Sequence, residues 1–129
     1  MILNGRKIST GKATGEALVT SMGISFYGGV DPETGCIVEK GHELEDQSIA
    51  GRVLVFPTGK GSTVGSYTLY RLKKAGLAPA AIINAESETI TAVGCIISDI
   101  PCVDHLPIEQ IKTGMQARVD GENGMVEIS

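Results

Sequence analysis

Short apolar runs alternate with amphipathic stretches along the chain and predict a sheet with crossing helices. Arg52 to Phe56 (RVLVF) and Ala80 to Asn84 (AAIIN) are continuous apolar runs, typical of parallel strands that are buried on both faces. Between them, residues 63–75 have helical spacing, and Gly76 follows as a typical C-terminal cap. This order predicts a strand–helix–strand unit with two parallel strands. The inward face predicted for the helix consists of Val64, Tyr67, Leu69, Leu72 and Ala75.

The patterns on both sides of this unit extend the predicted sheet. Residues 86–98 are predicted to form a second helix, which a short strand over 100–104 follows. Residues 12–21 have strand-like patterning, with Gly15 at a predicted bulge. Residues 115–129 alternate around Asp-Gly and Asn-Gly steps and predict a hairpin. The inward face predicted for the second helix consists of Ile90, Val93, Ile96 and Ile97.

One long stretch between the predicted strands has no regular pattern. Residues 22–35 combine several glycines with an Asp-Pro step, a composition typical of loops. A loop of this length in a compact domain usually contributes to function. The chain has 129 residues and no linker or repeat that divides it, so we expect one α/β domain over residues 1–129.

Charge and composition exclude several classes of function. The formal net charge is −4, and the one basic cluster, Arg71, Lys73 and Lys74, complements the dipole at a predicted helix end. A nucleic-acid binder would present a dense basic surface instead. No apolar stretch approaches the about 18 residues of a membrane helix, and the N-terminus lacks the apolar core of a signal peptide. We therefore expect a cytoplasmic protein without nucleic-acid or membrane partners.

The cysteines and histidines have no local metal-binding or disulfide signature. Cys36, Cys95 and Cys102 are odd in number and lack a CxxC spacing, so a disulfide scaffold is excluded and an iron–sulfur ligand set is not indicated. Buried thiols are the simpler interpretation. His42 and His105 each stand beside acidic residues and are interpreted as surface or loop histidines.

The glycine-rich segment after the first buried run comes close to known phosphate-binding motifs. In PTGKGSTVG, residues 57–65, Lys60 precedes a glycine rather than a Walker Ser or Thr, and the glycine spacing misses the dinucleotide fingerprint. Gly61, Ser62 and Thr63 nevertheless stand at a predicted helix start, just past the carboxyl end of a buried strand. Free N–H groups there attract phosphate or carboxylate. Ser62 is interpreted either as a helix N-cap or as a reactive hydroxyl.

Four stretches, in this order, resemble the aconitase X swivel-domain family: SFYGGVDPETG, RVLVFPTGKGSTVGSY, LAPAAIINAESETITAVG and IPCVD. The similarity covers nearly the whole chain, and the GKGST block and the SFYGGVD loop are its most specific parts. The resemblance implies a swivelling β/β/α fold, like the C-terminal domain of aconitase and the small subunit of isopropylmalate isomerase. In such enzymes the swivel domain closes over a partner that bears an iron–sulfur cluster.

The resemblance also implies roles for residues in the two specific blocks. Ser62 matches the serine that acts as a base, and Gly61 and Thr63 would contact the substrate through their backbone. Lys60 is a further candidate for the substrate site. The candidates from the preceding loop are Phe26, Gly28, Gly29 and Asp31. We expect no cofactor on this chain and an iron–sulfur cluster on a large subunit.

The function that the resemblance implies is that of a hydro-lyase subunit, inactive alone and paired with a large subunit in a heterodimer or higher assembly. The expected reaction dehydrates (R)-5-phosphomevalonate to trans-anhydromevalonate 5-phosphate in the archaeal mevalonate pathway of isoprenoid biosynthesis. A related alternative keeps the mechanism and takes cis-3-hydroxyproline as substrate. A third interpretation is a non-catalytic anion-binding module, in which Ser62 only caps a helix.

Overall fold

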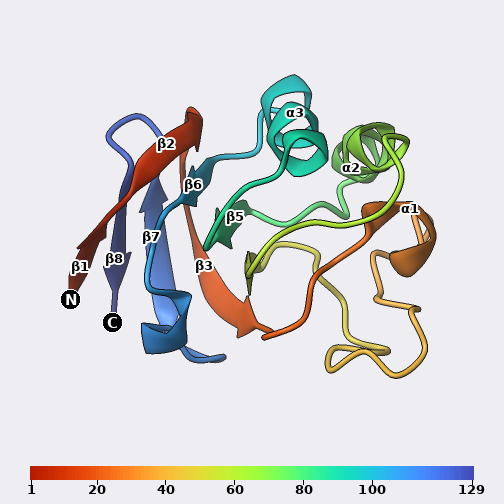
Figure 1. Ribbon diagram of the computed structural model, residues 1–129, viewed down its shortest axis with the longest axis horizontal. Coiled ribbons are helices and arrows are strands. Elements are labelled where there is room, and N and C mark those ends of the chain that lie inside the picture. The colour runs from red at the N-terminus through yellow and green to blue at the C-terminus, as the bar shows by residue number, and fades with distance from the viewer.

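The computed structural model describes residues 1–129 as an eight-stranded mixed sheet with helices along one side (Figure 1). The strand order is β1-β8-β7-β3-β4-β5-β6-β2, and β3 to β6 run parallel. The strands are β1 (Ile2–Asn4), β2 (Arg6–Ser9), β3 (Lys12–Val19), β4 (Val53–Phe56), β5 (Ala81–Asn84), β6 (Cys102–Asp104), β7 (Gln116–Asp120) and β8 (Met125–Ile128). The helices are α1 (Phe26–Gly29), α2 (Gly65–Lys74), α3 (Thr89–Ile97) and the 3-10 helix η1 (Ile108–Gln110). The α/β class predicted from the sequence is confirmed.

The elements form three layers. Figure 1 shows β1, β7 and β8 on one side, the parallel strands in the middle, and α2 and α3 on the other side. Along β4, Val53 and Val55 belong to the core between the two halves of the sheet, whereas Leu54 and Phe56 belong to the core under the helices. Because both faces of the parallel strands are buried, their sequences are continuous apolar runs.

The predicted strand–helix–strand unit and the C-terminal hairpin are both confirmed. Strands β4 and β5 pair in parallel and α2 connects them, while β7 and β8 pair antiparallel. Gly76 has φ +75° and ends α2 as predicted. Its N–H donates to the carbonyl of Lys73 at 3.1 Å, and the N–H of Leu77 donates to the carbonyl of Leu72 at 2.9 Å. This pair of bonds is the Schellman arrangement that a left-handed glycine permits.

The predicted inward face of α2 is only partly correct. Leu69 and Leu72 are fully buried, but Val64, Tyr67 and Ala75 are exposed. The remaining buried positions of the helix are small or polar, namely Gly65, Ser66 and Thr68.

The predicted inward face of α3 is wrong for three residues, because Val93, Ile96 and Ile97 are exposed. The reason is the close approach of α2 and α3. A Cβ on Gly94 would lie 2.7 Å from Leu69 Cδ1 and 3.2 Å from Ser66 Cα. Small residues therefore occupy the contact between the two helices, and the large apolar side chains of α3 point outward.

Three further features differ from the sequence-based expectation. Gly15 pairs with Ala117 in an unbroken register, so the predicted bulge is absent, and the carbonyl of Gly51 packs against Gly15 instead. The predicted 22–35 loop is irregular except for α1, a single distorted turn. Strands β1 and β2 were not predicted. No helix here is both long and apolar enough to span a bilayer.

Candidate functional site

The segments that follow the parallel strands gather at one edge of the sheet. Strands β3 to β6 point the same way, so the segments after their carboxyl ends share that edge. The segments after β3 and β4 are hydrogen-bonded to each other there. The N–H of Ile24 donates to the carbonyl of Thr58 at 3.4 Å, and the N–H of Lys60 donates to the carbonyl of Ile24 at 3.0 Å. The two blocks that contain the predicted site residues therefore lie side by side.

Ser62 lies exposed in the turn immediately before α2. Its hydroxyl oxygen accepts a hydrogen bond from the N–H of Val64 at 3.2 Å, and its carbonyl accepts one from the N–H of Gly65 at 2.9 Å. Helix α2 begins at Gly65, later than predicted, but Val64 already has helical backbone angles and no side-chain cap of its own. Ser62 Oγ therefore caps the turn that leads into α2, as one of the two interpretations of the sequence predicted.

Gly61 sets the conformation of this turn. Its φ of +97° lies in the region that favours glycine. A Cβ at this position would also overlap the hydroxyl oxygen of Ser25. That hydroxyl is held in place because it donates to the carbonyl of Tyr27 at 2.8 Å. The turn that presents Ser62 is thus seated directly on the segment that leads into α1.

Three successive backbone N–H groups beside Ser62 are unpaired. Those of Gly61, Ser62 and Thr63 donate to no protein atom. They precede a ten-residue helix, whose dipole favours negative charge at its N-terminus. Consecutive free N–H groups at such a position attract carboxylate or phosphate oxygens. The turn can therefore bind an anion next to the Ser62 hydroxyl.

The side chain of Lys60 runs across Gly23 to an acidic partner. Lys60 Nζ lies 3.0 Å from Glu39 Oε2, and a Cβ on Gly23 would lie 3.5 Å from Lys60 Cδ. The Lys60 side chain is 47% exposed. An exposed pair of this kind contributes at most about 1 kcal/mol to stability. The ammonium group can therefore exchange Glu39 for an anionic ligand at little cost.

The candidates on and beside α1 fall into two groups. Phe26 is buried and packs edge-on against Phe56, with ring centroids 5.9 Å apart, and Gly29 is buried as well. These two stabilise the core under the site. Gly28 and Asp31 instead line a surface groove of about 410 Å³ together with the first turns of α2.

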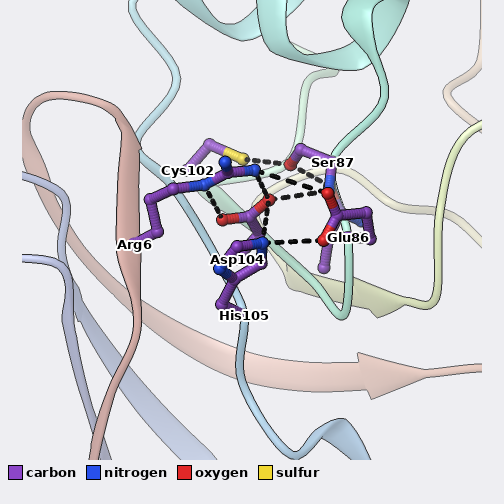
Figure 2. A network of polar contacts seen from close by, with 7 residues as sticks. Arg6, Glu86, Ser87, Cys102, Asp104 and His105 are labelled. Carbon is purple, nitrogen blue, oxygen red and sulfur yellow. Dashed lines mark hydrogen bonds and ion pairs between the residues drawn. The ribbon is translucent and has the colours of Figure 1, made fainter.

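A network of charged side chains that the sequence did not reveal lies where β2, β5 and β6 meet (Figure 2). Arg6 Nε donates to Asp104 Oδ1 at 2.9 Å, and an Arg6 terminal nitrogen donates to Asp104 Oδ2 at 2.7 Å. The N–H of Ser87 donates to Asp104 Oδ2 at 2.8 Å. His105 Nε2 lies 2.7 Å from Glu86 Oε2. Arg6 and Asp104 are 98 residues apart, so no local pattern could have identified the pair.

The network keeps a fully buried carboxylate charged. Burial alone would raise the pKa of Asp104, but the Arg6 guanidinium and the Ser87 N–H outweigh it and hold the pKa of Asp104 below its usual value. Hydrogen bonding to Asp104 raises the pKa of Arg6 in turn. Glu86, Asp104 and His105 bring one possible metal-ligand atom each within 4.8 Å of the others. Because Arg6 and Ser87 already engage the Asp104 oxygens, we interpret the cluster as an ion-pair network.

The cysteines are not arranged as a cluster site. Cys95 and Cys102 are buried in the core beneath the helices, and Cys36 is partly exposed elsewhere. A hydrogen bond with Cys102, together with burial, raises the pKa of the Cys95 thiol well above its usual value. None of the three cysteines lies in a group of three or more side chains that could bind a metal ion. The residues of this chain do not fit an iron–sulfur cluster.

The two histidines differ from each other. His105 is an exposed loop residue, as predicted, and has the unusual φ of +60°. His42 is in a loop but buried, contrary to a surface position. Its Nε2 donates to the carbonyl of Gly23 at 3.0 Å, and its Nδ1 accepts the N–H of Leu44 at 3.0 Å. His42 therefore fixes the segment beneath Lys60.

Comparison with known proteins identifies relatives along the full length of the chain. The aconitase X swivel domain family matches residues 2–128. The phosphomevalonate dehydratase small subunit of Thermococcus kodakarensis is 58% identical over 99% of this chain and 96% of its own length. The protein of that name from Methanocella arvoryzae is 55% identical over the whole of both chains.

Solved structures agree with this assignment. A crystal structure of Thermococcus kodakaraensis aconitase X in its holo-form has a TM-score of 0.98 and 56% identity, over 100% of this chain and 98% of that chain. A solution structure of a UPF0107 protein has a TM-score of 0.91 and 49% identity, over 100% of this chain and 99% of that chain. The family match, the sequence identities and the shared fold lead to one conclusion: this chain belongs to the aconitase X swivel domain family.

Proposed function

We propose that this chain is the small subunit of a two-subunit hydro-lyase that dehydrates (R)-5-phosphomevalonate to trans-anhydromevalonate 5-phosphate. Residues 1–129 act as one swivel domain that closes over a large subunit in the cytoplasm. The names of the full-length relatives from Thermococcus kodakarensis and Methanocella arvoryzae support this choice of substrate over cis-3-hydroxyproline. The structural observation that carries the proposal is the exposed Ser62 hydroxyl beside three unpaired N–H groups.

The unpaired N–H groups suit an anionic substrate. Phosphomevalonate has a carboxylate and a phosphate, and either group can accept hydrogen bonds from the backbone of Gly61, Ser62 and Thr63. The Lys60 ammonium group can also bind the substrate anion once its ion pair with Glu39 is broken. A substrate carboxylate held at this turn places the neighbouring carbon close to the Ser62 hydroxyl.

Ser62 is the proposed base. The reaction breaks the C–H bond beside the carboxylate and the C–OH bond on the next carbon, which releases hydroxide. The proton that the base takes finally joins this hydroxide as water, and the base is restored. A neutral serine is a weak base, so the proton acceptor is the Ser62 alkoxide, which becomes a hydroxyl when it takes the substrate proton. The N–H of Val64, which donates to Ser62 Oγ, and the N-terminus of α2 both stabilise negative charge on that oxygen.

The divided site explains the need for a partner. Ser62 is exposed in this chain, and water would protonate and solvate an alkoxide there. Closure against a large subunit would exclude that water. An iron–sulfur cluster on the large subunit would supply a Lewis acid for the departing hydroxyl.

The test is reconstitution with the large subunit and an assay of Ser62→Ala with phosphomevalonate and, separately, with cis-3-hydroxyproline. We expect the variant to bind the large subunit normally and to lose at least about 100-fold in kcat, as for the loss of a general base. Thr10→Ala is the matched control. Thr10 follows β2 at the amino end of β6, the edge opposite Ser62, and its hydroxyl is also exposed. A Ser62→Ala complex with the wild-type rate would refute the role of Ser62.

A further inference from the structure

Large apolar side chains are exposed on one side of the molecule. Of ten such side chains, eight belong to the three α-helices, the residue before α2 and the segment after α1. We call these eight residues the apolar face: Tyr27, Val38, Val64, Tyr67, Tyr70, Val93, Ile96 and Ile97. Tyr67 is the most exposed of them, at 70%. The other two, Met1 and Ile2, lie at the N-terminus.

Three shallow grooves join all of these residues except Ile96 into one surface. The first has a volume of about 410 Å³, lies between α1 and α2, and contains Tyr27, Val38, Val64 and Tyr67. The second, about 340 Å³, lies between α2 and α3 and contains Tyr67, Val93 and Ile97. The third, about 290 Å³, contains Tyr70 and Ile97. Because Tyr67 lines the first two grooves and Ile97 lines the last two, the apolar face is continuous.

The composition of α3 is that of a covered helix. The segment TITAVGCII contains no charged residue, although Val93, Ile96 and Ile97 all face outward. A helix at a free surface presents polar and charged residues on its outer side. Contiguous exposed apolar surface usually marks a protein–protein contact. We therefore expect another protein to bury this side of α3.

Basic side chains border the apolar face at the end of α2. Arg71 lines the first groove, Lys74 lies 5.4 Å from the centre of the Tyr70 ring, and Lys73 lines the third groove. None of the three forms a salt bridge within the chain. The chain as a whole carries a formal charge of −4, whereas this cluster is positively charged. A complementary partner would present an apolar patch with Asp or Glu at its border.

We infer that the apolar face is the surface on which the large subunit docks. This inference rests on the proposed function and extends it to a specific contact. Val64 lines the first groove and Thr63 lines the second, and both follow Ser62 directly. A partner that fills both grooves therefore lies against the turn that presents Ser62. Docking on the apolar face would bring the large subunit to the reacting hydroxyl.

The test measures the affinity of the full chain for the large subunit of phosphomevalonate dehydratase from the same organism. In the variant Tyr67→Gln/Ile97→Gln, two exposed side chains of the apolar face become polar while both helices keep a good helix former. We expect the Kd to rise at least tenfold. Ile2→Gln is the matched control, because Ile2 is 54% exposed on β1, away from the apolar face. Its Kd should stay within about twofold of the wild type, as for a surface substitution outside the contact.

Two further measurements make the result decisive. The thermal midpoint of the double variant should match that of the wild type, and Arg71→Glu should also weaken binding. An unchanged Kd for the double variant would overturn the inference, while Ser62→Ala would still test the proposed function independently. A wild-type chain that binds no large subunit would overturn both. Light scattering could also show that the wild-type chain is a dimer and the double variant a monomer that still binds the large subunit with the wild-type Kd. In that case a second copy of the chain covers the apolar face, and the inference is wrong.

Discussion

Gly61 lies so close to Ser25 that a methyl group on Gly61 would overlap the Ser25 hydroxyl oxygen. Gly61→Ala would therefore have to move either the turn that carries Ser62 or the Ser25 hydroxyl, which would lose its bond to the Tyr27 carbonyl, in addition to straining a φ of +97°. We expect a loss of about 1–3 kcal/mol in the free energy of unfolding. We also expect at least a tenfold loss of dehydratase activity in the reconstituted complex.

The control for this variant is Gly114→Ala. Gly114 also has φ +97°, but no atom lies within 4 Å of where its Cβ would be. Urea unfolding of both variants separates the cost of the backbone angle from the cost of the Ser25 contact. Equal losses of stability and full activity in both variants would show that the contact does not position Ser62.

Lys60→Gln tests whether this lysine binds the substrate. The exposed ion pair with Glu39 contributes little to stability, so we expect the free energy of unfolding to change by less than about 0.5 kcal/mol. The KM should rise about tenfold if an anionic group of the substrate pairs with the ammonium, which corresponds to about 1.4 kcal/mol. Glu39→Gln breaks the same ion pair but keeps the positive charge, and its KM should not rise. Equal KM values for the two variants would argue against substrate binding by Lys60.

Asp104→Asn should destabilise the chain at neutral pH and much less in acid. The pKa of Asp104 is below its usual value in the folded protein, and a lowered pKa stabilises the fold at every pH above the unfolded value of about 3.9. This contribution disappears as the pH falls through the folded pKa. We expect a loss of about 1–3 kcal/mol at pH 7, the cost of breaking a buried charged hydrogen bond, and a shrinking difference below about pH 4.

Urea unfolding at several pH values measures this effect. Glu109→Gln is the control, because Glu109 is exposed and forms no salt bridge. A difference between Asp104→Asn and wild type that is the same at pH 3 and pH 7 would contradict the ion-pair interpretation.

Glu88→Ala should destabilise α3. The Glu88 carboxylate accepts the N–H groups of Ile90 and Thr91 at 2.8 and 2.6 Å and is the N-cap of the helix. Loss of a side-chain cap costs about 0.5–2 kcal/mol, which thermal or urea unfolding can resolve. Glu86→Ala removes a neighbouring, exposed carboxylate that caps nothing, and we expect a smaller loss from it. A larger effect from Glu86→Ala would contradict this assignment.

The parts of the fold that could be predicted are those with local patterns. Continuous apolar runs identified β4 and β5, and Asp-Gly and Asn-Gly steps identified the β7–β8 hairpin. Strands β1 and β2 were missed because their short segments, ILN and RKIS, have no continuous apolar run and only Gly5 separates them. Helical spacing located the apolar sides of α2 and α3, but it does not tell whether the chain itself or a partner covers them.

In the candidate site, too, only the features with a local sequence pattern could be predicted. Ser62 could be placed from the glycine-rich turn after a buried strand, and the structure puts it in an exposed turn at that edge. The contact of Gly61 with Ser25 and the Arg6–Asp104 pair could not be predicted, because they join residues that are distant in the sequence. No local sequence pattern around a hydroxyl or carboxylate side chain predicts which distant residue it will contact.

Strands β1 and β2 stand at opposite ends of the strand order, yet only Gly5 connects them. The first nine residues therefore cover both outer edges of the sheet, β8 on one side and β6 on the other. An uncovered edge is a template for pairing with other chains and for aggregation. Removal of this short segment would uncover two such edges at once, so the solubility of the protein depends on its first nine residues more than their number suggests.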